Sequence, residues 1–147
     1  MSVPVSVILG RKGQEVVTVS GHTTLTEVAR MLTAERVGAL VVTDADGSVS
    51  GMISERDIVR VVAEHGPAAL DQPVDAVMTR SVTTCTPATT VTELAAMMTE
   101  GRVRHLPVLD EGRLAGIVSI GDVVKSRIDE LATQAESLER YVTGTAY

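Results

Sequence analysis

The feature that most constrains the fold of this chain is an internal duplication. Residues 116–124 read Gly-Ile-Val-Ser-Ile-Gly-Asp-Val-Val, and residues 51–59 read Gly-Met-Ile-Ser-Glu-Arg-Asp-Ile-Val. In both segments an apolar run ends at a Ser, and an Asp follows three residues later. One such motif usually marks only a helix start, because the Ser caps free backbone N–H groups and the acid favours the positive end of the helix dipole. Two copies in matching contexts favour a repeated structural unit.

The residues around the two motifs also repeat. Residues 23–32 match 89–98, and residues 37–42 match 103–108, both at an offset of 66. The Gly that opens each motif shifts by 65, because one residue is lost in the turn before it. With two copies only, the pattern indicates a duplicated domain and not a solenoid array.

Each copy is predicted to fold as strand, helix, strand, strand and helix, which places the chain in the α+β class. Thr24 and Ser54 begin the helices of the first copy, and Thr90 and Ser119 those of the second. The strands are expected at residues 15–19, 37–43 and 49–53 in the first copy, and at 82–85, 103–109 and 114–119 in the second. A half this small cannot bury both faces of its sheet, so the halves should pack together about a pseudo-twofold axis, with both Ser-x-x-Asp corners beside one central cleft.

The predicted organisation has three parts. Residues 1–66 hold an N-terminal segment and the first repeat, residues 67–126 a linker and the second repeat, and residues 127–147 a helix extension and a loose tail. The linker is expected at Glu64–Pro73, which is rich in Gly and Pro.

Composition excludes several functional classes. The 147 residues are 44% apolar but include no Phe or Trp, so the core is expected to be aliphatic. No apolar run is long enough to span a membrane, and we expect no signal peptide. Cys85 is the only cysteine, which excludes an intrachain disulfide and favours a reducing cytoplasm. The net charge of −6 disfavours nucleic acid as a partner.

Two further segments allow two interpretations each. Gly10-Arg11-Lys12-Gly13 is either a solvated basic turn or a loop that contacts a phosphate. Near the C-terminus, apolar residues recur at alternating steps of four and three, a heptad stripe that covers either its own domain or another subunit. We favour the subunit contact; the stripe consists of Val124, Ile128, Leu131, Ala135, Leu138 and Val142.

The duplicated pattern resembles a cystathionine-beta-synthase (CBS) domain pair, also called a Bateman module. The resemblance covers residues 16–125, and both Gly-apolar-apolar-Ser-x-x-Asp signatures follow the family pattern. Because no catalytic or transporter domain accompanies the repeats, the chain is most similar to the stand-alone bacterial members. The resemblance implies a cleft that binds an adenosine-containing ligand, namely AMP, ADP, ATP, NAD(H) or S-adenosylmethionine, and a disk-like homodimer.

The chemistry of the signature residues is compatible with this ligand class. The carboxylates of Asp57 and Asp122 can accept hydrogen bonds from both ribose hydroxyls, and Ser54 and Ser119 can contact the sugar or a phosphate. Helix N-termini attract phosphate, and Arg56 is placed to reach one. The resemblance further implies base pockets near Thr18, Gly38, Ala39, Val82, Arg104 and His105, and Lys12 of the basic turn is a further expected phosphate contact.

The second motif departs from the first, because Gly121 stands where the first has Arg56. Anion binding at the second corner is therefore in doubt unless Arg102, Arg104 or His105 compensates. His105 is equally well interpreted as a partly buried strand residue.

The function predicted from these features is a non-catalytic adenine-nucleotide sensor whose state an unidentified protein reads, with AMP as the leading ligand. We find no catalytic triad, metal cluster or catalytic cofactor motif, and Cys85 is most simply a small core residue. The alternatives are a constitutive dimeric interaction module with a vestigial cleft and a regulator that binds S-adenosylmethionine.

Overall fold

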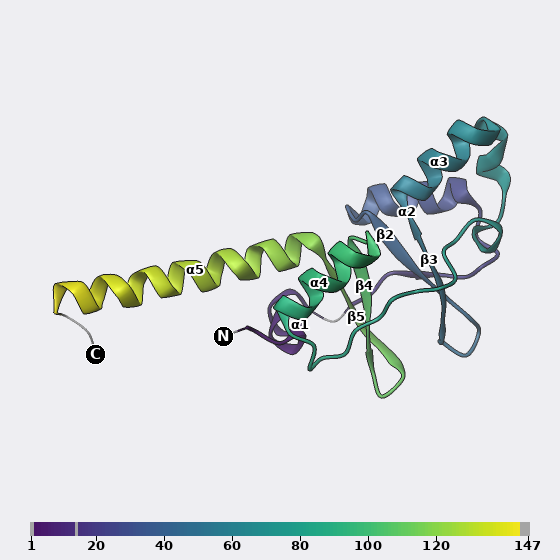
Figure 1. Cartoon of the computed structure of the whole chain (residues 1–147). Coiled ribbons are helices and arrows are strands. Elements are labelled where there is room, and N and C mark those ends of the chain that lie inside the picture. Colours follow the sequence, from purple (N-terminus) through teal and green to yellow (C-terminus); the bar gives the residue numbers. More distant parts are fainter. Residues whose placement is uncertain (1, 14, 145–147) are drawn as a thin grey trace.

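The computed structural model describes residues 2–13 and 15–144, and it confirms an α+β fold made of two similar repeats and a long C-terminal helix (Figure 1). The predicted loose tail falls on residues 145–147, outside the described part. In chain order the elements are α1 (Val5–Lys12), β1 (Thr18–Val19), α2 (Leu25–Glu35), β2 (Ala39–Thr43), β3 (Val49–Ser54), α3 (Glu55–His65), α4 (Val91–Gly101), β4 (His105–Asp110), β5 (Arg113–Ser119) and α5 (Ile120–Thr143).

The first repeat is a three-stranded sheet covered by two helices. β1 runs parallel to β2, and β2 runs antiparallel to β3. The amphipathic helices α2 and α3 pack their apolar faces on this sheet. The resulting core includes Leu25, Val28, Leu40 and Ile53, each at most 1% exposed.

The second repeat reproduces the antiparallel hairpin of the first but has a two-stranded sheet. β4 pairs antiparallel with β5, and the ladder is interrupted between Val108 and Leu109, as the β2–β3 ladder is between Val42 and Thr43. The two interruptions are 66 residues apart, the offset of the duplication. The duplication therefore extends to the register of the strands.

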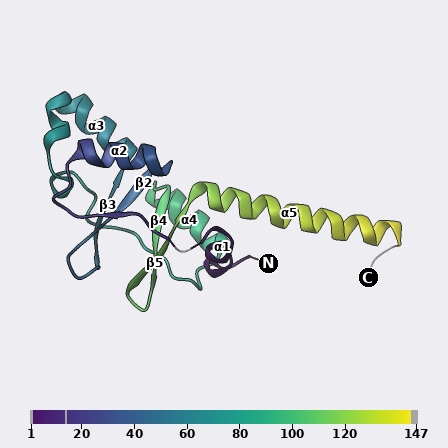
Figure 2. The same ribbon diagram turned by 180° about the vertical axis from the view of Figure 1, so that it is seen from behind.

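Helix α1 replaces the expected basic turn at residues 10–13, and this prediction was wrong. The helix that contains the apolar run continues through Lys12, and Gly13 ends it at a φ of 91°. The helix buries Val5, Ile8 and Leu9 in the core of the second repeat, although it precedes the first repeat in the chain. Figures 1 and 2 both show α1 beside β5 and α4.

The connector between the repeats is ordered and contributes to the first core. It forms two short 3₁₀ turns at Pro67–Asp71 and Val74–Ala76, and the side chains of Ala69 and Val74 are buried. Beyond the turns, Thr79 exchanges backbone hydrogen bonds with Met52 at 2.9 and 3.0 Å. The connector thus passes along the edge strand β3 of the first repeat.

Two of the predicted strands are shorter than expected. At residues 15–19 only Thr18 and Val19 pair with β2. At residues 82–85 the structure has no strand, because Cys85 alone bridges to Val108. The segment before Cys85 instead lines a cleft, described below.

Helix α5 has 24 residues and projects far beyond the body of the molecule (Figures 1 and 2). Within the described residues, no helix is both long and apolar enough to cross a membrane.

Candidate functional site

The first Ser-x-x-Asp corner joins β3 to α3 and is held by a reciprocal cap. Ser54 Oγ accepts a hydrogen bond from the Asp57 N–H at 3.2 Å, and Asp57 Oδ2 accepts from the Ser54 N–H at 2.9 Å and the Ser54 hydroxyl at 3.0 Å. The other carboxylate oxygen, Oδ1, lies 3.2 Å from Arg60 Nη1. Asp57 is only 9% exposed, so its carboxylate is rigidly positioned.

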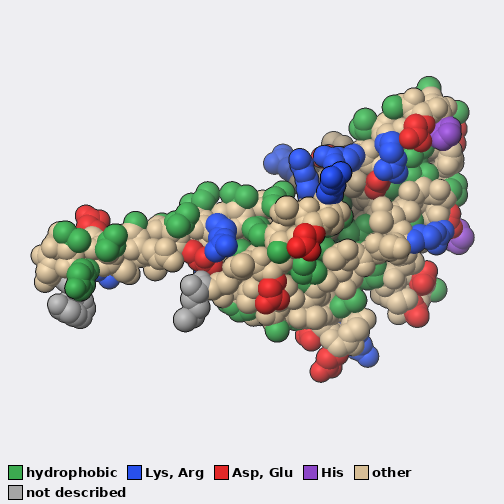
Figure 3. Space-filling view, in the orientation of Figure 1, with side chains coloured by type: hydrophobic (Ala, Val, Ile, Leu, Met, Phe, Trp, Pro, Cys, Tyr) green, Lys and Arg blue, Asp and Glu red, His purple; other side chains and the backbone are tan. Residues whose placement is uncertain are grey.

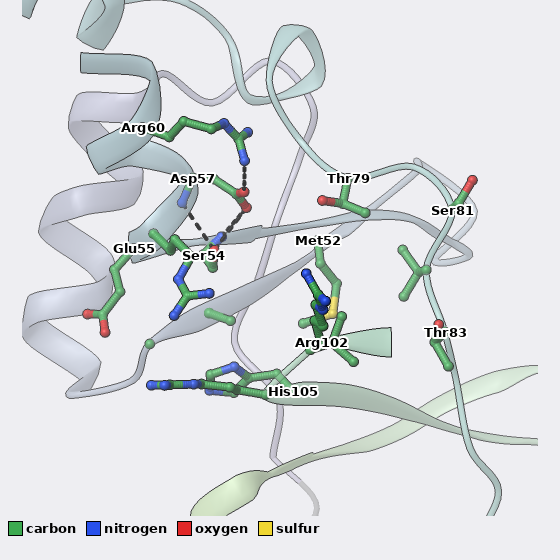
Figure 4. A pocket seen from close by; sticks show the side chains of 16 residues that line it. Met52, Ser54, Glu55, Asp57, Arg60, Thr79, Ser81, Thr83, Arg102 and His105 are labelled. Atoms are coloured by element: carbon green, nitrogen blue, oxygen red, sulfur yellow. Dashed lines mark hydrogen bonds and ion pairs between the residues drawn. The ribbon is translucent and has the colours of Figure 1, made fainter. Parts of the chain in front are cut away.

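This corner opens onto a cleft between the two repeats, with a volume of about 300 Å³ (Figure 4). This volume lies at the lower end of the range typical of small-molecule pockets. One wall comes from the first repeat, a second from the connector and a third from the start of β4. The lining residues are Gly38, Ala39, Met52, Ser54, Glu55, Arg56, Asp57, Arg60, Thr79, Ser81, Val82, Thr83, Arg102, Val103, Arg104 and His105.

The cleft concentrates positive charge. Four arginines line it, namely Arg56, Arg60, Arg102 and Arg104, whereas its acidic residues are Glu55 and Asp57. Figure 3 shows Lys and Arg side chains gathered where the two repeats meet. Because the whole chain carries a net charge of −6, this local excess of cations marks the cleft as a place for an anion.

His105 lies at the floor of the cleft, at the start of β4. A Cβ added to Gly38 would lie 3.3 Å from His105 Cε1 and 3.5 Å from Glu55 Oε1, so glycine permits this close approach. Burial lowers the pKa of His105 below 6.5, and the charge of Glu55 opposes this effect. Burial thus favours the neutral imidazole, which can donate one hydrogen bond and accept another.

The second Ser-x-x-Asp corner has the same cap but a different neighbour. Asp122 Oδ2 accepts hydrogen bonds from the Ser119 N–H at 2.8 Å and the Ser119 hydroxyl at 3.1 Å. The same oxygen lies 2.7 Å from Lys12 Nζ, and this ammonium also donates to the Ile117 carbonyl at 3.0 Å. An internal cation from α1 therefore pairs with the carboxylate of this corner.

The structure brings most of the predicted site residues together at the first corner. Eight of them line its cleft: Gly38, Ala39, Ser54, Arg56, Asp57, Val82, Arg104 and His105. The remaining five do not line this cleft: Lys12, Ser119, Gly121 and Asp122 lie at the second corner, and Thr18 is exposed on β1.

Sequence reasoning missed Arg60 and the connector residues Thr79, Ser81 and Thr83. Arg60 stands three residues after Asp57, a spacing that brings side chains together on a helix and could have identified it. Nothing local to residues 79–83 indicates that they pass over a pocket.

The residues that line the cleft can bind an anionic ligand, but they show no catalytic arrangement. Cys85 lies outside it, is 4% exposed, and burial raises the pKa of its thiol to about 11. In the described part of the chain, no three His, Cys, Asp or Glu residues are grouped as a metal site would require.

Comparison with known proteins identifies both repeats. A family model described as "CBS domain" matches residues 12–64 and 74–129. Among solved structures, the CBS-domain containing protein ATU1752 from Agrobacterium tumefaciens is 50% identical, with a TM-score of 0.84 over 86% of this chain and 95% of that one. Among curated proteins, the mitochondrial CBS domain-containing protein CBSX3 of Arabidopsis thaliana is 34% identical over 125 residues, which are 82% of this chain and 61% of that protein.

Some similar structures contain ligands. The CBS domain pair of protein MJ0100, solved in complex with 5-methylthioadenosine and S-adenosyl-L-methionine, is 25% identical, with a TM-score of 0.76 over 85% of this chain and 95% of that one. Both of its ligands contain adenosine, so a protein with this fold binds the class of molecule that the duplicated corners predict.

Proposed function

The chain belongs to the CBS domain family, and we propose that it is a sensor whose first cleft binds an adenosine nucleotide through its ribose and phosphate groups. The family match supports a regulatory module and not an enzyme, and relatives are named as CBS domain-containing proteins. The observation that carries the proposal is the position of Asp57 in a cleft lined by four arginines.

The ribose contact rests on the acceptor capacity of Asp57. A carboxylate offers about four acceptor positions, and Ser54 and Arg60 use three of those of Asp57. Because Arg60 is half exposed, with a side-chain exposure of 53%, it can swing away and leave Oδ1 for the ribose hydroxyls. The displaced guanidinium then remains within the cleft, where a phosphate would bind it.

The arginines favour a ligand that carries phosphate. Guanidinium groups bind phosphate oxygens through paired, charge-assisted hydrogen bonds, which are about twice as strong as neutral ones. Arg56 and Arg104 approach from different repeats, so a phosphate between them would hold the repeats together. The proposed ligands are therefore AMP first, with ADP, ATP and NAD(H) as alternatives, ahead of S-adenosylmethionine, which carries no phosphate.

The proposed consequence of binding is regulatory. A ligand that contacts both repeats favours one packing of the repeats over others, and a partner protein that distinguishes these states can read its concentration. We place this sensor in the cytoplasm because its single cysteine is free.

Calorimetric titration with AMP, ATP, 5-methylthioadenosine and S-adenosylmethionine tests the proposal. We expect Asp57→Ala to weaken every adenosine ligand, and the paired change Arg56→Met with Arg104→Met to weaken AMP and ATP at least tenfold but 5-methylthioadenosine little. Asp122→Ala, which removes the equivalent acid from the second corner, is the matched control and should leave these affinities unchanged.

Two outcomes would contradict the proposal. Tighter binding of S-adenosylmethionine or 5-methylthioadenosine than of AMP would exclude the phosphate contact. Equal loss of affinity in Asp57→Ala and Asp122→Ala would show that the two corners bind alike. Circular dichroism of each variant should show an unchanged fold.

A further inference from the structure

The second half of α5 projects beyond the body of the molecule and exposes its apolar side chains. Up to Glu130 the helix is attached to the body, because the Val3 N–H donates to Glu130 Oε1 at 3.2 Å and Arg11 Nη1 lies 3.2 Å from Asp129 Oδ2. From residue 131 to residue 144 every residue is exposed. Most helical stability in proteins comes from packing of an apolar face, so a partner that covers this segment would stabilise it.

The exposed helix is apolar along one side. Ile128 is 59% exposed, Leu131 64%, Leu138 65% and Val142 76%, and Val124 is 50% exposed on the same stripe. Figure 3 shows hydrophobic side chains along this projecting helix. Alternating steps of four and three are the spacing with which two α-helices pack as a coiled coil.

The stripe is complementary to itself when two copies of α5 run antiparallel. Val124 then faces Val142 of the partner subunit, Ile128 faces Leu138 of the partner subunit, and Leu131 faces Ala135 of the partner subunit. The residue numbers of each pair add up to 266, so one register aligns every layer. The small side chains of Ala132 and Ala135 lie at the centre, where the helices come closest.

Charges beside the stripe favour the same register. Lys125 directly follows the stripe residue Val124, and Glu139 directly follows the stripe residue Leu138, so both flank the contact between the two helices. The antiparallel register brings Lys125 next to Glu139 of the partner subunit, and symmetry makes this contact twice. In a parallel pair, Lys125 would instead lie next to Ile120 of the partner subunit and Glu139 next to Gln134 of the partner subunit, with no opposite charge. Charge complementarity therefore selects the antiparallel pair.

We propose that the apolar stripe of α5 is the dimerisation surface of this protein, and that its partner is the α5 helix of a second copy, packed antiparallel. The surface lies mainly beyond residue 129, where the match to the CBS domain family ends. The inference does not rest on the proposed nucleotide site, and either can fail alone.

Charge exchange tests the register. Sedimentation equilibrium of the full chain should show a dimer, and Lys125→Glu or Glu139→Lys should each raise the dimer dissociation constant about tenfold, because two like-charge contacts replace two attractive ones. The double variant Lys125→Glu, Glu139→Lys should restore the original constant. Glu136→Lys, an equal charge change on the outer side of α5, should change it little.

Cross-linking tests the orientation directly, in a Cys85→Ser background. Ile128→Cys and Leu138→Cys chains should form a disulfide when mixed and little when each is oxidised alone. A monomeric full chain, a double variant as weak as the single ones, or self-cross-linking of Ile128→Cys without the mixed product would overturn the proposal.

Discussion

Lys12 and Asp122, 110 residues apart in the chain, form an ion pair with Nζ 2.7 Å from Oδ2. The ammonium also binds the carbonyl of Ile117, whose counterpart in the first repeat is Met52. The backbone of Met52 pairs with Thr79 instead, and Thr79 belongs to the wall of the cleft. The two capped corners are therefore alike in their caps but differ in their neighbours: the first borders the cleft, whereas the acid of the second is paired with a lysine.

The Lys12–Asp122 pair predicts one adenosine ligand per chain in the wild type. Lys12→Met should add a second, weaker binding event for adenosine, because Asp122 loses the cation that competes with a ribose. Adenosine is the suitable probe, since the second corner has Gly121 in place of an arginine. Calorimetry measures the stoichiometry.

Arg11→Met is the matched control for that experiment. It removes a neighbouring cation of α1 whose partner is Asp129, and it should leave the stoichiometry at one. Two sites in the wild type would contradict the prediction, as would a second event that also appears in Arg11→Met.

Gly51 and Gly116 occupy equivalent positions in β3 and β5 but should tolerate alanine unequally. A Cβ at Gly51 would lie 2.7 Å from the Thr79 carbonyl oxygen and 2.6 Å from Met78 Sδ, and the backbone atom cannot move without loss of the connector pairing. A Cβ at Gly116 would meet the end of the Leu9 side chain at 2.6 Å, which can rotate. We expect Gly51→Ala to cost about 2–3 kcal/mol and Gly116→Ala about 1 kcal/mol.

Urea unfolding measures the free energy of unfolding of the Gly51→Ala and Gly116→Ala variants. Gly10→Ala, in α1 with open space around it, should stabilise the protein by about 0.5–1 kcal/mol through helix propensity. Equal costs at Gly51 and Gly116 would show that the connector yields as easily as a leucine side chain.

Ser126 should be replaceable with a gain in stability. Its side chain is 3% exposed, and its hydroxyl has no hydrogen-bond partner among the described residues. Ser126→Ala removes an unsatisfied buried polar group and should raise the free energy of unfolding by about 1 kcal/mol. Ser137→Ala, on the exposed part of the same helix, measures the contribution of helix propensity alone, and an equal gain there would refute the burial argument.

His105 should make the protein less stable in mild acid. Burial lowers its pKa in the folded state, so below pH 6.5 the unfolded chain binds more protons than the folded one. Stability is therefore fully present above pH 6.5 and is lost as the pH falls towards the lowered pKa. Lys12 and Arg104 strengthen this effect, whereas Glu55 and Asp122 oppose it.

Urea unfolding between pH 7.5 and pH 5 measures the effect. The wild type should lose more stability over this range than His105→Gln, which cannot bind the proton. Parallel pH profiles of the two proteins would show that His105 is not responsible.

Local features of the fold could be predicted from the sequence. The caps at Ser54 and Ser119 depend on residues three positions apart, so the motif is sufficient to place them. The duplication predicted the repeated helices and hairpins because similar sequences have similar preferences for local secondary structure. Eight of the candidate residues meet at one cleft because they belong to the first corner, to the starts of β2 and β4, or to the connector beside them.

The long-range features could not be predicted in this way. Residues 82–85 have strand-like composition, but the connector is held to β3 at Thr79 and reaches β4 only at Cys85, so no ladder forms. The sequence predicts the apolar stripe of α5, but only the structure shows that Ile128, Leu131, Leu138 and Val142 are exposed in the described chain.

The sequence by itself determined two capped corners of the CBS type, because hydrogen bonds between near neighbours require only the right residues at the right spacing. Tertiary structure alone decided that the corners are unequal. Helix α1 buries its apolar face in the second repeat, and this packing carries Lys12 to Asp122 across 110 residues of chain. Burial of Val5, Ile8 and Leu9 drives this contact, and no local pattern specifies which core receives them.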